Sequence, residues 1–237
     1  MEKYGVSFKE MNKKQKVKHI WTYYRYHILA SIIALFVVGN LGKSIFFSKP
    51  ANLVEVLISG ALNLNDEQYT VSEKFETDYR IGLSLTPLDW ESDDQMVTAM
   101  YQKIPTLLTV RSLDILALPV KQYEAFTMVN GEDMFTPLED IPELSKVLKE
   151  QEDNLFTYDK GIDDEGNTID TQEHVYGIKV KSFKGISCIE NNEEMVIGLT
   201  STMKDKEKSI KVFKYLLGDE TALDHFLDTD NVEPESN

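Results

Sequence analysis

Cysteine is almost absent from this chain, because Cys188 is the only one among 237 residues. A single cysteine excludes an intramolecular disulfide and any C-x-x-C redox or zinc motif. The chain is therefore not a disulfide-rich secreted module, and a domain outside the cytoplasm would have to be stabilised by its hydrophobic core. We interpret Cys188 as a packing residue, since a free cysteine mostly behaves as a small hydrophobic side chain.

Motifs that carry chemistry are also missing. The sequence has no G-x-G-x-x-G or G-x-x-x-x-G-K-[ST] phosphate loop, no H-E-x-x-H zinc motif and no G-x-S-x-G nucleophile elbow. Neighbouring acidic residues such as Asp93 and Asp94 point apart on a helix and cannot act as paired catalytic carboxylates. We predict no catalytic residues, no metal and no cofactor. A cell-envelope enzyme is the alternative from another function class, since catalytic groups can be distant in sequence.

The acidic segment 159–173, DKGIDDEGNTIDTQE, raises the question of calcium. A calcium loop places oxygen ligands at alternate positions, as in D-x-D-x-D-G, so that they converge on one ion. The segment does not follow that spacing. We predict a solvated turn between two strands, with a calcium loop as the alternative.

Positive charge is scarce after residue 49, where sixteen Lys and Arg accompany 38 Asp and Glu. Nucleic-acid binding needs clustered positive charge, so we predict no nucleic-acid partner for this part of the chain. Residues 1–27 have the opposite balance, with seven Lys and Arg against Glu2 and Glu10.

One long hydrophobic run, ILASIIALFVVGNLGKSIFF, covers residues 28–47 and contains a single charge, Lys43. Twenty helical residues reach about 30 Å, the thickness of a bilayer's hydrocarbon core, so we predict a transmembrane helix. Lys and Arg accumulate on the cytoplasmic side, which predicts a cytoplasmic segment 1–27 and an extracellular remainder. A cleaved signal peptide is the alternative; we favour an uncleaved anchor, because no small-x-small cleavage site follows the run.

This region also contains candidates for membrane contacts. Aromatic side chains are stable at headgroup depth and lysine can extend towards water, which gives the predicted interface residues Trp21, Tyr23, Tyr24, Tyr26 and Lys43. Small residues and an amide can contact a second membrane helix, and the candidates are Ala30, Ala34 and Asn40.

Strand and helix patterns alternate after residue 51. We predict strands at 52–58, 81–85 and 113–118, separated by helices at 66–79 and 92–103, the second of them capped by Ser92. This order implies a parallel sheet flanked by helices, and hence an α/β fold with a mainly parallel sheet.

The second half of the chain is less regular. We predict helices at 122–128 and 141–151, strands at 154–158, 174–181 and 195–199, and a last helix that Ser201 or Thr202 caps and Gly218 closes. Residues 50–228 would form one extracytoplasmic domain, and the polar tail 229–237 would be disordered.

Three segments resemble parts of one family in the same order. They are LDILALPVKQYEAFTMVNGEDMFTPLEDIPEL (113–144), HVYGIKV (174–180) and IGLTSTMKDKEKSIKVFKYLLGDE (197–220). Together they look like bacterial extracellular solute-binding proteins with the type 2 periplasmic-binding fold, and KVKHIWTYYRYHI (16–28) resembles membrane-anchored relatives in Gram-positive bacteria. The chain departs from the family where Lys179 replaces a usual proline, in lacking the lipid-modified cysteine, and in its shorter outer part.

The resemblance implies a ligand cleft near residues 118–123 and 176–178 and a much reduced second lobe. Candidate cleft residues are Trp90, Tyr123, Phe126 and Tyr176. We therefore expect an anchored interaction protein of the cell membrane, an accessory subunit of a transporter or envelope complex. Its partner would be a membrane protein, and it would bind small solutes weakly. A functional solute receptor for an ABC transporter is the alternative in the same class.

Overall fold

The computed structural model describes residues 12–46, 51–64, 66–162, 168–184, 186 and 194–227. The chain divides into two compact units, Met1–Pro50 and Ala51–Asn237. Three predicted features lie outside the described residues: the packing role of Cys188, the acidic residues 163–165 and the disordered tail 229–237.

The described part of the first unit is one helix, α1 (Lys13–Phe46), of 34 residues. Large apolar side chains are exposed along it, with Leu35 73% and Phe36 72% exposed. Within the part of the chain that the structure describes, no helix is both long enough and apolar enough to span a membrane.

The predicted membrane-contact residues lie on α1. The side chains among them that the structure describes are all exposed: Trp21, Tyr24, Tyr26, Ala30 and Ala34. The side chains of Tyr23, Asn40 and Lys43 lie outside the described part.

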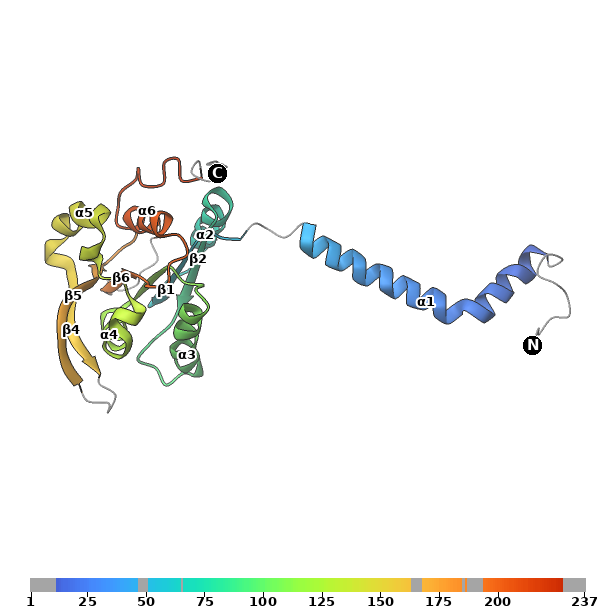
Figure 1. Ribbon diagram of the computed structural model, residues 1–237, viewed down its shortest axis with the longest axis horizontal. Coiled ribbons are helices and arrows are strands. Elements are labelled where there is room, and N and C mark those ends of the chain that lie inside the picture. Colours follow the sequence, from blue (N-terminus) through green and yellow to red (C-terminus); the bar gives the residue numbers. More distant parts are fainter. Residues whose placement is uncertain are drawn as a thin grey trace, which may run out of the picture. The chain divides into compact units, whose positions relative to one another are not determined.

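The second unit is an α/β domain around a mixed six-stranded sheet of order β2-β1-β3-β6-β5-β4 (Figure 1). The strands are β1 (Val54–Gly60), β2 (Ile81–Pro87), β3 (Ile115–Pro119), β4 (Leu155–Ile162), β5 (Thr168–Val180) and β6 (Met195–Leu199). β1 is parallel to β2 and to β3, whereas β6 is antiparallel to β3 and to β5, and β4 to β5. The α/β class is thus confirmed, and the strand–helix repeat correctly predicts the parallel half. The sheet predicted as mainly parallel is mixed, because β6, β5 and β4 join it in antiparallel orientation.

Helices cover both faces of this sheet (Figure 1). They are α2 (Asp66–Tyr79), α3 (Gln95–Thr109), α4 (Val120–Met134), α5 (Ser145–Glu150) and α6 (Lys206–Leu216), with short 3₁₀ turns at Leu138–Asp140, Pro142–Leu144 and Glu152–Asn154. α2 and α6 contribute to one hydrophobic core, and α3 and α4 to the other. Side chains alternate between the two along β1, where Val56 and Ile58 face the first core and Leu57 the second.

Two predicted helix caps are wrong, and an aspartate replaces each. Asp94, not Ser92, begins α3 by accepting a hydrogen bond from the Met96 N–H at 3.0 Å. Asp205 begins α6 by accepting one from the Lys208 N–H at 3.1 Å.

Tertiary hydrogen bonds engage Ser201, one of the two predicted caps of α6, elsewhere. Its hydroxyl donates to the Asp133 carbonyl and its N–H to the Met134 carbonyl at 2.9 Å, which ties this residue to the end of α4. Gly218 closes α6 as predicted, with φ of 113°, a conformation that glycine adopts without strain.

The predicted loop 159–173 is largely wrong, because β4 runs to Ile162 and β5 begins at Thr168. Only residues 178–180 of β5 pair with β6, whereas its pairing with β4 covers most of its length. A ribbon that pairs mainly with itself buries few side chains, so it lacks the apolar alternation by which a strand is recognised in sequence.

The carboxylate of Asp114 joins three segments at the start of β3. It accepts hydrogen bonds from the Glu55 N–H and the Lys204 N–H, both at 2.7 Å, and the side chain is fully buried. The Asp114 carbonyl accepts from the Thr200 N–H at 3.0 Å. Burial raises the pKa of the Asp114 carboxyl above its ordinary value, and the two backbone donors act in the opposite direction.

We expect Asp114→Asn to destabilise the domain by about 1–3 kcal/mol, because the amide NH₂ would face a backbone N–H that needs an acceptor. The folded state holds the Asp114 proton more tightly than the unfolded chain does, since its pKa is raised. The stability that this group contributes is therefore greatest at acidic pH and is lost as pH rises through the folded pKa. The deficit of the variant should consequently widen as pH falls.

Urea unfolding of residues 51–237 at several pH values measures both effects. Asp93→Asn, at an exposed position, is the matched control and should leave stability within about 0.5 kcal/mol of the wild type. Equal stability of the Asp114→Asn variant and the wild type would show that the carboxylate does not hold this junction.

Candidate functional site

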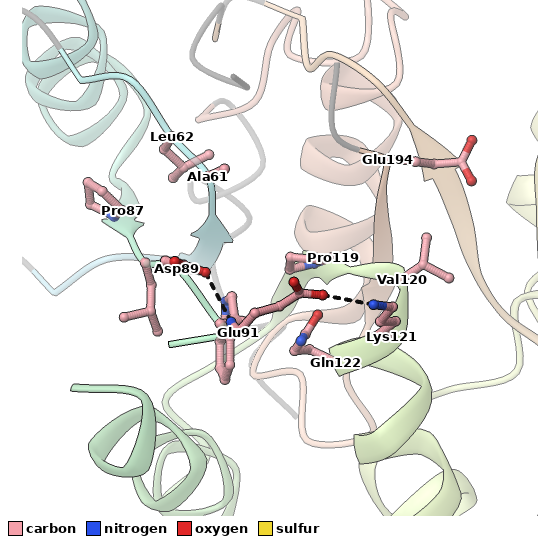
Figure 2. A pocket seen from close by; sticks show the side chains of 12 residues that line it. Ala61, Leu62, Pro87, Asp89, Glu91, Pro119, Val120, Lys121, Gln122 and Glu194 are labelled. Atoms are coloured by element: carbon pink, nitrogen blue, oxygen red, sulfur yellow. Dashed lines mark hydrogen bonds and ion pairs between the residues drawn. The ribbon is translucent and has the colours of Figure 1, made fainter. Parts of the chain in front are cut away.

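A cavity of about 640 Å³ opens at one edge of the sheet. Its walls come from the residues that follow β1, β2 and β3 and from the residue before β6 (Figure 2). The lining residues are Ala61, Leu62, Pro87, Leu88, Asp89, Trp90, Glu91, Pro119, Val120, Lys121, Gln122 and Glu194. In an open α/β sheet, the crevice at the carboxyl ends of strands where the winding reverses is the usual ligand position. Here the winding reverses between β1 and β3.

An ion pair crosses this cavity. Lys121 Nζ lies 2.8 Å from Glu91 Oε1, which joins the first turn of α4 to the loop after β2 (Figure 2). The hydrogen bond to Lys121 lowers the pKa of Glu91, and the same contact raises the pKa of Lys121. Both side chains are mostly exposed, so the ion pair contributes little to the stability of the fold. Each of the two charged groups could therefore separate from the other and bind a charged group of a ligand or partner instead.

Hydrogen bonds between side chains and backbone hold the loop after β2. The Glu91 N–H donates to Asp89 Oδ1 at 3.0 Å (Figure 2). The Ser92 hydroxyl donates to the Asp89 carbonyl at 2.8 Å. The Leu88 N–H donates to the Gly60 carbonyl at 2.8 Å, which ties this loop to the end of β1. Glu91 therefore projects from an ordered turn.

Trp90 is the one predicted cleft residue that lines the cavity. Its ring is buried and packs edge-on against Tyr101 at 5.2 Å between ring centroids. Its Nε1–H is buried without a hydrogen-bond partner among the residues that the structure describes. An indole N–H usually forms a hydrogen bond when it is buried, so the Trp90 Nε1–H is an unsatisfied donor on a residue that lines the cavity.

The other three predicted cleft residues lie in the core beneath α3 and α4. Tyr123, Phe126 and Tyr176 belong to one hydrophobic cluster together with Trp90, and none of the three lines the cavity. The Tyr123 hydroxyl donates to the Tyr176 carbonyl at 2.8 Å, and burial raises the pKa of Tyr123 well above its ordinary value. Tyr123 thus fastens the first turns of α4, which bear the cavity residues Lys121 and Gln122, to β5.

A glycine on β6 makes room for this hydrogen bond. A Cβ atom at Gly198 would lie 1.8 Å from the Tyr123 hydroxyl oxygen and 2.5 Å from the Tyr176 carbonyl oxygen. Both distances are far below van der Waals contact, so the position requires glycine for space.

Sequence reasoning placed the cleft near residues 118–123 without selecting Lys121 or Gln122 as site residues, and it missed Glu91 and Glu194. A signal for two of them was present, because Glu91 follows one predicted strand and Lys121 another, and the carboxyl ends of parallel strands share an edge. Glu194 could not be found in this way, since its strand enters the sheet antiparallel and from far along the chain.

No protein-family model, curated protein or solved structure matches this chain. The resemblance to solute-binding proteins therefore stays a prediction, and the fold and the cavity are the observations on which a function must be based.

We expect Gly198→Ala to destabilise the domain by about 1–3 kcal/mol, because the new methyl group must displace the Tyr123 ring. Tyr123→Phe alone should cost about 1 kcal/mol, the loss of one buried hydrogen bond. The double variant should be more stable than the sum of the two losses predicts, since the atom nearest the methyl group is then gone. Urea unfolding of the four proteins measures this coupling, and strictly additive losses would contradict the proposed clash.

We expect the Glu91 carboxyl to titrate below the ordinary glutamate range, and to return to that range in Lys121→Gln. Carbon-13 NMR of the side-chain carboxyl over a pH series reports this directly. Lys149→Gln, at an exposed position on α5, removes the same charge elsewhere and should leave the Glu91 titration unchanged. A Glu91 curve that does not respond to Lys121→Gln would mean that the ion pair is absent in solution.

Proposed function

We propose that this protein is a membrane-anchored interaction protein whose α/β domain is a single, reduced solute-binding-like lobe outside the cytoplasm. In this proposal α1 holds the domain in the cell membrane, and the domain acts as an accessory subunit of a transporter or another envelope complex. Its partner is a membrane protein, and catalysis is not part of its role.

The observation that carries the proposal is the exposure of the apolar part of α1. Leu29, Ile32, Ile33, Leu35 and Phe36 are all more than half exposed. These five apolar residues are distributed around the helix axis. This part of α1 therefore has no continuous polar face that could be exposed to water while an apolar face is buried. Residues 37–47 support the anchor through their sequence alone, which continues the apolar run. The basic segment 1–27 supports a cytoplasmic N-terminus.

The open cavity supports an interaction role over tight solute binding. A solute receptor gains affinity by closing two lobes over its ligand. Among the described residues, the cavity is lined by strand ends, loops and the first turn of α4 at one end of a single sheet, and its charged residues Glu91 and Lys121 are exposed. Such a surface covers a small molecule on one side only. A partner protein that inserts a loop into the cavity supplies further contacts of its own on the other side. Anchoring in the same membrane raises the effective concentration to about millimolar, so a weak interface is sufficient.

A functional solute receptor is the second candidate, and the cavity itself favours it. Its volume of about 640 Å³ is within the range of small-molecule sites. The Trp90 Nε1–H, on a residue that lines the cavity, is buried and has no partner among the described residues.

Site-specific photocrosslinking in membranes distinguishes the two candidates. We expect a photoreactive residue at Gln122, on the cavity wall, to form an adduct with a specific membrane protein, and the same residue at Lys149 on α5 to form none. Residues 51–237 expressed outside the cytoplasm without α1 should lose most of the adduct, because the effective concentration falls.

A thermal-shift screen of amino acids, sugars and peptides on the full-length protein in detergent provides the second measurement. We expect no solute to raise the melting temperature by more than about 2 °C at 100 μM, since weak binding adds little stability by mass action. A solute with micromolar affinity and no adduct at Gln122 would replace this proposal with the receptor.

A further inference from the structure

Four lysines occupy the first two turns of α1, at positions 13, 14, 16 and 18. The segment Lys13–Phe46 contains no Asp or Glu, whereas α3 and α6 each begin with a capping aspartate. The N-terminal end of a helix carries partial positive charge, so cations there oppose helix formation. Local stability therefore does not explain these lysines, and such a conflict is expected where residues serve a binding function.

Three of the four lysines surround an apolar groove. Lys13, Lys14 and Lys18, together with Val17 and Trp21, line a surface cavity of about 450 Å³ whose walls are almost wholly apolar. Positions 13, 17 and 21 are spaced four apart, as are 14 and 18, so all five lie on one side of the helix. Lysine carbon stems can supply such apolar walls, since a lysine side chain covers apolar surface while its ammonium group extends towards water.

The charges of this groove are available to a partner. Lys13, Lys14 and Lys18 are exposed, and none of them forms an ion pair with another residue that the structure describes. Arg25, by contrast, is engaged further along the helix, where its guanidinium lies 4.6 Å from the Tyr26 ring centroid and donates to Tyr26 Oη at 2.8 Å. Val17 and Trp21 are 67% and 64% exposed, although water is a poor environment for both.

We propose that this groove binds an anionic phospholipid, with the lipid phosphate held by the ammonium groups of Lys13, Lys14 and Lys18 and the adjoining carbon chain packed on Val17 and Trp21. A lipid headgroup is the ligand that presents negative charge and hydrocarbon within a few ångströms of each other, which is the combination that the groove offers. This inference rests on the proposed anchor, because the anchor places these residues beside the cytoplasmic leaflet, where anionic lipids supply the negative surface potential.

Fluorescence quenching in vesicles tests the proposal with the full-length protein. The protein is reconstituted into phosphatidylcholine vesicles that contain phosphatidylglycerol, with bromine on the acyl chains of either the neutral or the anionic lipid at equal mole fraction. The chain has two tryptophans, and Trp90 is buried in the α/β domain, so Trp21 is the residue that brominated chains can reach. We expect brominated phosphatidylglycerol to quench several times more strongly than its neutral counterpart, and 1 M salt to abolish the difference.

Charge variants assign the preference to the groove. Lys13→Gln, Lys14→Gln and Lys18→Gln together should remove the preference, since each charge near an anionic surface changes the association constant about fivefold. The triple variant with arginine at the same positions should retain it. Lys103→Gln, Lys149→Gln and Lys206→Gln together remove equal charge from exposed sites of the α/β domain and should leave the preference unchanged.

The outcomes separate this inference from the anchor. Equal quenching by the two brominated lipids, or a preference that survives the triple glutamine variant, would overturn the lipid site and leave the anchor standing. No quenching by either lipid would mean that α1 is not in the bilayer, and would overturn both.

Discussion

The buried carboxylate of Asp114 is the interaction on which the rest of the domain depends. It lies at the start of β3, where the parallel half of the sheet meets the antiparallel half, and it accepts backbone hydrogen bonds from Glu55 and Lys204. The Thr200 N–H donates to the carbonyl of the same residue, so the end of β6 is held at the same point. A buried charge is costly unless hydrogen bonds satisfy it, and the two donors meet this requirement only when all three segments are in place. Folding of the junction therefore couples three segments, the first 59 residues before Asp114 and the last 90 residues after it.

The cavity depends on that junction because its walls are the opposite ends of the same strands. β1 and β3 run from Asp114 to the cavity edge, and α4 begins directly after β3 at Val120. The hydrogen bond from Tyr123 to the Tyr176 carbonyl then fixes the first turns of α4 against β5. The rigid part of the site is thus its floor, while the Glu91–Lys121 pair at its rim is exposed and free to rearrange. This division suits a surface that accepts a partner better than a pocket that encloses a ligand.

The two units serve different purposes by opposite physical means. The α/β domain buries its apolar side chains in two cores on either side of the sheet, and its surface is acidic. α1 exposes its apolar side chains, and its first turns are basic. In the proposed function the apolar side chains of the helix are buried in the bilayer. The proposed lipid groove extends this logic, since it uses a stretch, residues 13–18, in which four lysines occur without an intervening acid.

Sequence alone determined those features that depend on neighbours along the chain. The helix 66–79 and the strand 195–199 agree with the structure residue for residue, because their patterns are local and their boundaries carry clear breaks. The parallel orientation of the first three strands also followed from sequence, since a strand–helix–strand connection normally joins parallel strands. Tertiary structure decided what depends on distant partners. Asp205 rather than Ser201 caps α6 because Ser201 is bonded to the end of α4, and the β4–β5 ribbon forms where sequence predicted a loop. Tyr123 and Tyr176 are core residues joined by a hydrogen bond, and Gly198, far along the chain from Tyr123, leaves space for that bond. Glu91, Lys121 and Glu194 meet only when three loops converge, and no local pattern encodes a convergence of that kind.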